Sequence, residues 1–325
     1  MTKIIIRTPN FIGDTIMMLS AYNLLSFEYP NAKFTIVCKK HCVDIFRGFN
    51  NIEDIIVDDT KDGGNRVIKI FNLIKRIKQK QYDLGVVYHN TLLDGLIFKF
   101  SNINKIIGYE KEGQKFIFDY WEKIQRNRHY VNHYAHLING YLGFKYKKII
   151  PILLNFNKTS LIQKNNKKNV GFILGGDYAG GRKYPSELSI ELMHLLSKNN
   201  NFNIVFLGGY KDKENHSQYE SILTQKNTNC LNLTGKTSVG EFIDVIAGLD
   251  LLVSMDTSAI HIASAVDTKF ICFVGKSPSP MELVKPKVNF GSYLFYGEDY
   301  IEDADFMNDL EPGIILDEIE RRLND

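Results

Sequence analysis

The residues best suited to chemistry lie in LLVSMDTSAIHIASA (251–265), where an apolar strand meets a small polar turn and then a helix. Asp256, Thr257 and Ser258 form the turn, and His261 lies one turn into the helix. Such a junction directs backbone N–H groups and the positive end of the helix dipole into one crevice, where they can hold a phosphate. A plain helix N-cap explains the same residues. This segment alone favours the cap, and a second junction of related design raises the case for a phosphate site.

A second strand–turn–helix junction opens the chain. KIII (3–6) is a short apolar run typical of a buried parallel strand, and a helix is predicted over 14–27. Gly13 permits a tight turn, after which Asp14 lies at the carboxyl edge of the strand, where open α/β sheets carry their chemistry. Asp14 fits a catalytic carboxylate and a first-turn acid that complements the helix dipole equally well. Neither a dinucleotide fingerprint nor a P-loop is present.

The composition is that of a two-domain globular protein, with 325 residues of which 44% are hydrophobic and 24% charged. No apolar run approaches the about 18 residues that a membrane helix needs, and the N-terminus lacks the pattern of a signal peptide. The four cysteines fit no zinc spacing. We therefore expect reduced thiols and a cytoplasmic location.

A net charge of +3 conceals a strong asymmetry. Residues 1–155 carry 23 Lys and Arg against 14 Asp and Glu, a net +9, whereas the remainder carries 17 against 23, a net −6. The basic half indicates an anionic partner or a membrane surface, although a solvated lysine-rich face explains it as well. Nucleic acid is not expected, because no recognition motif or stacking platform accompanies the charge.

Strand and helix patterns alternate through both halves, which predicts an α/β protein with two doubly wound parallel sheets. We expect a first domain over 1–155, a polar linker over 156–168 and a second domain over 169–325. Phe116 to Tyr146 is predicted to be mostly helical. The last helix, after Pro312, has an apolar face that could pack back on the first domain. Two such domains would face each other across a central cleft, although independent domains are the alternative.

Four ordered motifs carry a resemblance to a known family, the ADP-heptose:lipopolysaccharide heptosyltransferases (glycosyltransferase family 9), and most of all to its heptosyltransferase II branch. The opening IIIRTPNFIGDTIMMLSAYNLLSFEYPNAKFTIV (4–37) resembles a strand, R-x-P-N-W-x-G-D and a helix, with Phe11 replacing tryptophan. The other three are YDLGVV (82–87) with INKIIGYEKEG (103–113), LGGDYAGGRKYPSE (174–187), and LTGKTSVGEFIDVIAGLDLLVSMDTSAIHIASAV (233–266).

The resemblance implies a GT-B fold of two Rossmann-like domains, the first binding the acceptor and the second the nucleotide sugar. It also implies an inverting, metal-independent transfer of heptose from ADP-L-glycero-D-manno-heptose to the inner core of lipopolysaccharide or lipooligosaccharide. In this family pattern Asp14 would be the general base that takes the proton of the acceptor hydroxyl. Arg182, where the family has lysine, would neutralise the ADP phosphates, and Lys183 could share that task.

The resemblance further implies a set of donor contacts. Asp212 would hold the ribose hydroxyls, Thr257 and Ser258 would offer N–H groups to the diphosphate, and Tyr178 would contact the donor. The remaining donor-binding residues in this pattern are Gly13, Asp256 and His261. Ser258 stands where the family has glycine, so another nucleotide sugar is an alternative donor.

The acceptor would be an anionic lipopolysaccharide core, with peripheral contact at the cytoplasmic face of the inner membrane. Hypothetical acceptor contacts are Asn10, Lys39, Lys40, Lys69 and Arg126. No cofactor or metal is expected, because nothing places a third ligand near Asp58 and Asp59, and cations and helix ends can carry the diphosphate charge. The alternatives are another nucleotide sugar or surface-glycan acceptor, such as capsule, and a non-catalytic nucleotide-sugar binding protein.

Overall fold

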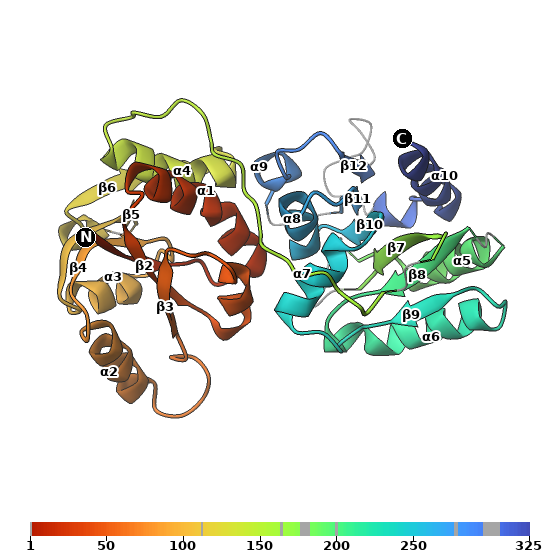
Figure 1. Cartoon of the computed structure of the whole chain (residues 1–325), viewed down its shortest axis with the longest axis horizontal. Helices are drawn as coiled ribbons and strands as arrows, with labels where there is room; N and C mark the ends of the chain where they lie inside the picture. The colour runs from red at the N-terminus through yellow and green to blue at the C-terminus, as the bar shows by residue number, and fades with distance from the viewer. Residues whose placement is uncertain are drawn as a thin grey trace. The chain divides into compact units, whose positions relative to one another are not determined.

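The computed structural model describes residues 2–111, 113–162, 165–175, 183–198, 201–275, 279–294 and 306–325 (Figure 1). The chain divides into two compact units, Met1–Asn155 and Phe156–Asp325. None of the described helices combines the length and the apolar character that crossing a bilayer requires.

The first unit contains a parallel sheet with strand order β3-β2-β1-β4-β5-β6. Its strands are β1 (Lys3–Arg7), β2 (Lys33–Cys38), β3 (Ile52–Val57), β4 (Tyr82–Val87), β5 (Ile103–Glu110) and β6 (Tyr120–Lys123). Its helices are α1 (Ile12–Glu28), α2 (Arg66–Ile77), α3 (Leu92–Lys99), α4 (Tyr130–Tyr141) and the 3-10 turns η1 (Lys40–Phe46) and η2 (Gln114–Ile117). The strand order reverses between β1 and β4, which makes their carboxyl ends the switch point where ligands bind in such sheets.

The run of isoleucines in β1 is explained by helices on both faces of the sheet. Ile5 belongs to a buried cluster with Leu73 and Ile77 of α2 and Phe98 of α3. Neighbouring residues of a strand point to opposite faces, so Ile4 and Ile6, also fully buried, face the side that α1 and α4 cover (Figure 1). The sheet is therefore a rigid central layer that fixes the turns at its carboxyl edge.

The second unit repeats the arrangement, with strand order β12-β11-β10-β7-β8-β9 and a reversal between β7 and β10. Its strands are β7 (Lys168–Ile173), β8 (Phe202–Phe206), β9 (Cys230–Asn232), β10 (Leu251–Met255), β11 (Phe270–Phe273) and β12 (Gly291–Leu294). Its helices are α5 (Ser186–Ser197), α6 (Lys213–Thr224), α7 (Val239–Ala247), α8 (Ser258–Ala265), α9 (Met281–Val284), α10 (Pro312–Asn324) and the 3-10 turns η3 (Tyr210–Asp212) and η4 (Phe306–Asn308).

The last helix, α10, contributes to the core of the second unit. The apolar face of α10 carries Ile315 and Ile319, which are fully buried in the core of the second unit with Leu192 and Met193 of α5. The buried part of this face is thus used within its own unit.

The stretch from Phe116 to Tyr146 also differs from the prediction, because its helix is limited to α4. The carboxylate of Asp119 accepts a 2.7 Å hydrogen bond from the N–H of Ile106, and the next residues pair with β5 as the strand β6. A polar edge strand with alternating exposure lacks the apolar run that would reveal it.

Candidate active site

Asp14 lies in the first turn of α1, beside the switch point of the first sheet. Its side chain is half-buried, and Tyr134 of α4 donates a 3.3 Å hydrogen bond to Oδ1. Burial raises the pKa of Asp14 above its usual 3.8, and the hydrogen bond from Tyr134 opposes part of that rise. The carboxylate is therefore a stronger proton acceptor than an exposed aspartate.

Four residues before Asp14, the side chain of Asn10 is held by contacts from distant segments. Arg7 Nη2 donates to Asn10 Oδ1 at 3.0 Å. His89 Nε2 lies 2.7 Å from Asn10 Nδ2, and His41 Nε2 lies 2.6 Å from the Asn10 carbonyl oxygen. The turn that leads into α1 is thus fixed at three atoms of one residue.

Arg7, at the end of β1, is the centre of a buried charge network. Its Nε donates to Asp94 Oδ1 at 2.7 Å and its Nη2 to Asp58 Oδ2 at 2.8 Å. The three side chains are at most 9% exposed, so the ions are shielded from water. Lys39 Nζ lies 3.0 Å from Asp58 Oδ2 and adds a second cation.

The network keeps both acids ionised despite their burial. Burial by itself would raise the pKa of Asp94, but the hydrogen bond from His89 and the charge of Arg7 outweigh it and lower the pKa. At Asp58 burial is likewise outweighed by hydrogen bonds from Thr60 and by the Arg7 charge, so its pKa is also lowered. Since Asp94 Oδ2 accepts from His89 Nδ1 at 2.7 Å, His89 Nε2 is left to accept from the Asn10 amide.

The sequence analysis predicted no role for Arg7, His89 and Asp94, and it considered Asp58 only as a metal ligand. Asp58 and Asp94, which accept hydrogen bonds from Arg7, lie 51 and 87 residues from it in the sequence, so no local spacing connects them. A usable signal was present, however. Arg7 ends β1, Asp58 follows β3 and His89 follows β4 by two residues, and the carboxyl ends of parallel strands meet at one edge.

The other hypothetical acceptor contacts are not gathered into this network, apart from Lys39. Lys39 is itself buried against Asp58, which does not suit an exposed basic contact. Lys69 is half-buried and donates to the carbonyl oxygen of Asp59 at 3.2 Å. Lys40 and Arg126 are exposed.

At the switch point of the second sheet, glycines surround the carboxylate of Asp212. A Cβ atom at Gly175, just after β7, would lie 1.9 Å from Asp212 Oδ1, and one at Gly208, just after β8, would lie 2.8 Å from Oδ2. The N–H of Gly209 donates to Oδ2 at 3.0 Å. Within the described residues Asp212 makes no side-chain capping bond to α6, so it holds the turn after β8 rather than the helix.

Thr257 is the N-cap of α8, which bears out the simpler hypothesis for this residue. Its Oγ1 accepts from the N–H of Ala259 at 3.3 Å, and its carbonyl oxygen accepts from Ile260 at 3.4 Å. Ser258 begins the helix and is half-buried, whereas Asp256 and His261 are each 8% exposed. All four side chains therefore lie at or just behind the carboxyl end of β10.

Lys183 is exposed, and the next residue, Tyr184, is anchored at the carboxyl end of β10. The N–H of Tyr184 donates to Sδ of Met255, the last residue of β10, at 3.1 Å, and its hydroxyl donates to the carbonyl oxygen of Leu310 at 2.7 Å. This buried anchor places Lys183 next to the end of β10. Tyr178 and Arg182 lie outside the described residues. In the described part of the chain, no group of three or more His, Cys, Asp and Glu could hold a metal ion.

The sequence and the fold of this chain are similar to those of known proteins. The family profile described as Glycosyltransferase family 9 (heptosyltransferase) matches residues 70–289. Lipooligosaccharide heptosyltransferase 2 of Haemophilus influenzae is 22% identical over 295 residues, which cover 84% of this chain and 83% of that protein.

Two solved structures share the fold over nearly the whole chain. The Escherichia coli ADP-heptose lps heptosyltransferase II is 20% identical, with a TM-score of 0.84 over 99% of this chain and 98% of that one. The E. coli heptosyltransferase WaaC with ADP is 15% identical, with a TM-score of 0.80 over 99% of this chain and 100% of that one. These findings confirm the resemblance and the GT-B fold of two Rossmann-like domains.

Proposed function

Since the chain belongs to glycosyltransferase family 9, the heptosyltransferases, we propose that it transfers heptose from ADP-heptose to the inner core of lipopolysaccharide or lipooligosaccharide, with inversion. The observation that carries this proposal is Asp14, a half-buried carboxylate with a raised pKa beside the switch point of the first sheet. All six curated relatives are named as heptosyltransferase 2 enzymes, which supports this sugar and this class of acceptor.

In the proposed reaction the Asp14 carboxylate takes the proton of an acceptor hydroxyl. The electron pair left on the acceptor oxygen forms a C–O bond to the anomeric carbon of the donor. At the same time the bond from that carbon to the ADP oxygen breaks, and ADP leaves with its electron pair. One displacement of this kind inverts the anomeric centre. The fixed side chain of Asn10 stands at the same turn and is proposed to orient the acceptor for the attack.

The second unit is proposed to bind the donor. Asp212 would accept hydrogen bonds from the ribose hydroxyls, and the turn of Thr257 and Ser258 at α8 would face the diphosphate. Lys183 would carry part of the leaving charge, together with Arg182. The relative solved with ADP supports an adenosine diphosphate donor.

We place the reaction at the cytoplasmic face of the inner membrane, with the basic first unit toward the anionic acceptor. Residues 1–155 carry a net +9, which favours approach to phosphorylated lipid headgroups and core sugars. No cofactor is proposed.

The decisive experiment measures ADP release from ADP-heptose with heptose-deficient lipopolysaccharide as acceptor. Wild type should turn over, and Asp14→Asn should lose turnover while it still binds ADP in calorimetry. Asp62→Asn, a change of an exposed acid in the same unit, is the matched control and should stay active. Turnover by Asp14→Asn at the rate of wild type would rule out the general base proposed here.

One departure from the family pattern favours a second candidate, a transferase that uses a different nucleotide sugar. Ser258 replaces glycine at the first residue of α8, where a side chain crowds an approaching phosphate. Calorimetry with ADP, UDP and NAD separates the candidates: preference for UDP keeps the fold and overturns the heptose assignment. Tight binding of ADP by a protein that turns over no nucleotide sugar would instead indicate a binding protein.

A further inference from the structure

The outward face of α2 carries three large apolar side chains that the core of the first unit does not use. Val67, Ile68 and Phe71 are 60%, 57% and 67% exposed. The inward face of the same helix is complete without them, since Leu73 and Ile77 are buried in the core. A surface helix of a globular protein usually has polar residues on its outward face, so this exposed apolar face indicates an interaction surface.

Lysines and arginines are concentrated near these apolar residues in the sequence. Residues 61–80 contain seven Lys and Arg against one Asp, and Lys75 and Lys78 follow Phe71 on the same helix face at four and seven residues. Three other acids nearby are paired: Asp59 with Arg76 at 3.0 Å, and Glu53 and Asp54 with Lys80 at 3.1 Å each, which leaves Asp62 as an exposed acid beside the helix. The four cations that remain exposed, with no ion pair among the described residues, are Lys61, Arg66, Lys75 and Lys78.

The face is preformed rather than dependent on binding for its order. Asn65 caps α2, since its Oδ1 accepts from the N–H groups of Val67 at 3.0 Å and Ile68 at 3.3 Å. The pair of Arg76 with Asp59 ties the helix to the end of β3. In Figure 1, α2 and the loop before it form the lower border of the first unit.

We propose that this face, Val67, Ile68 and Phe71 with the exposed cations Lys61, Arg66, Lys75 and Lys78, docks the first unit on an anionic lipid bilayer. Apolar side chains beside Lys and Arg on one exposed helix face match the chemistry of the headgroup boundary, where acyl chains lie next to phosphates. A second copy of this chain fits poorly, because a symmetric contact would bring the same cations together. The proposal rests on the proposed function only for which membrane is meant.

The test is co-sedimentation of the full chain with vesicles, without donor or acceptor. Wild type should bind vesicles of phosphatidylcholine and phosphatidylglycerol, and bind much less to phosphatidylcholine alone or at high salt. The triple variant Val67→Gln, Ile68→Gln and Phe71→Gln should reduce the partition about tenfold or more, because it removes the apolar contact. Lys75→Gln with Lys78→Gln should reduce it by about fivefold or more and flatten the salt dependence.

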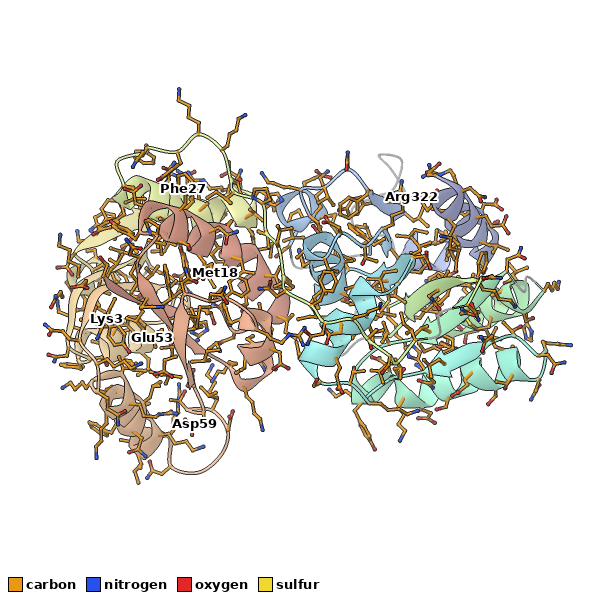
Figure 2. The ribbon with its side chains drawn as sticks, viewed as in Figure 1. Lys3, Met18, Phe27, Glu53, Asp59 and Arg322 are labelled. Carbon is orange, nitrogen blue, oxygen red and sulfur yellow. The ribbon has the colours of Figure 1, made fainter. Side chains whose placement is uncertain are left out.

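Phe27→Gln is the matched control, since Phe27 is also 67% exposed but lies on the upper border of the first unit, away from α2 (Figure 2). It should bind as wild type does. The proposal is overturned if wild type does not bind anionic vesicles, or if the triple variant binds as well as wild type. It is also overturned if sedimentation shows that wild type self-associates through these residues. Turnover of a water-soluble acceptor fragment, which needs no membrane, tests the enzyme assignment separately. If only the docking proposal fails, wild type and the triple variant both turn the fragment over; if the enzyme assignment fails, neither does.

Discussion

The two units share one strand order, yet different kinds of residues form the carboxyl edges of their sheets. At the edge of the first sheet, buried side-chain charges meet: Arg7, Asp58, Asp94 and Lys39. At the edge of the second sheet, glycines 175 and 208 leave room for the carboxylate of Asp212, and Thr257 caps α8. The topology thus fixes where a site can be, and the residues at the strand ends decide what it can do.

The difference matches the work proposed for each edge. A general base needs a carboxylate of raised pKa that is held in place, which favours a stiff network of paired charges. A diphosphate needs N–H groups at close range, which favours glycine and short side chains. The first edge should therefore be sensitive to the removal of charge, and the second to the removal of the one carboxylate that orders its turn.

The largest effect is expected from Asp14→Asn. It should lower kcat by about a hundred- to ten-thousandfold, because the acceptor hydroxyl loses its base, and leave the affinity for ADP unchanged. Steady-state ADP release and calorimetry on the same preparation measure the two quantities. Equal losses in turnover and ADP affinity would mean that the two edges do not divide the work as proposed.

Arg7→Met should be the most destabilising change at the first edge. It leaves Asp58 and Asp94 buried without their shared guanidinium, at a cost of about 3–5 kcal/mol in the free energy of unfolding. Urea denaturation measures this change. Arg76→Met is the control, because it breaks a half-exposed pair with Asp59 and should cost about 1 kcal/mol or less.

Acid should distinguish the two units in two steps. Burial lowers the pKa of His133 in the first unit and of His216 in the second to about 4, from 6.5, so each stays neutral in the folded protein while the unfolded chain takes up a proton. Both units should lose stability as the pH falls from about 6.5 to 4, by at most about 3 kcal/mol per histidine. Below that range the first unit should lose more than the second, because its buried acids Asp58 and Asp94 have lowered pKa values and their contribution disappears as they protonate. In the second unit the pKa is lowered at Glu241, which is exposed, and at Glu318, which is half-buried, so the loss there should be smaller.

Hydrogen exchange followed by mass spectrometry can assign each loss to its unit. His216→Gln is the control, and it should remove the first step from the second unit alone. Similar acid sensitivity of both units below pH 4 would show that the charge network does not set the difference between them.

Asp212→Ala should have a smaller effect on stability. It removes the acceptor for the Gly209 N–H and should cost about 1 kcal/mol, while ADP affinity falls because the ribose loses its partner. Calorimetry with ADP, beside Asp267→Ala as an exposed control in the same unit, measures the loss. Unchanged affinity for ADP would leave Asp212 with the turn as its only role.

Tyr134→Phe should give the smallest change, visible only in the pH profile. Its hydroxyl donates to Asp14 and thereby lowers the pKa of that carboxyl, so its loss should raise the pKa further. The acid limb of kcat/KM should move to higher pH, with little change at the plateau. A shift to lower pH, or none, would show that this hydrogen bond does not act on the base.

Much of the fold could be predicted because buried parallel strands leave short apolar runs and their helices leave periodic ones. KIII at 3–6 and LLVS at 251–254 are such runs, and both became central strands. The edge strand β6 could not be found this way, because its alternating exposure and polar residues give no apolar run. The packing of α10 could not be assigned either, since an apolar face does not say which core it joins.

The candidate site divides in the same manner. Asp14 and the turn at Thr257 could be found because strand, turn and helix are adjacent in sequence. The hold of Arg7 and His89 on Asn10 could not, because it depends on the ends of two strands, β1 and β4, that only the sheet brings together. Contacts of this kind become visible when the residue after each buried strand is read across the sheet order.

The close approach of Gly175 to Asp212 has a consequence for how this protein can evolve. With only 1.9 Å between Oδ1 and a Cβ at position 175, every substitution of that glycine conflicts with the carboxylate 37 positions later. A lineage that keeps the acid is confined to glycine at 175. A shorter residue at 212 relieves the closest conflict, but a Cβ at 175 would still lie 3.0 Å from the Cβ of residue 212, so even then only small side chains fit at 175.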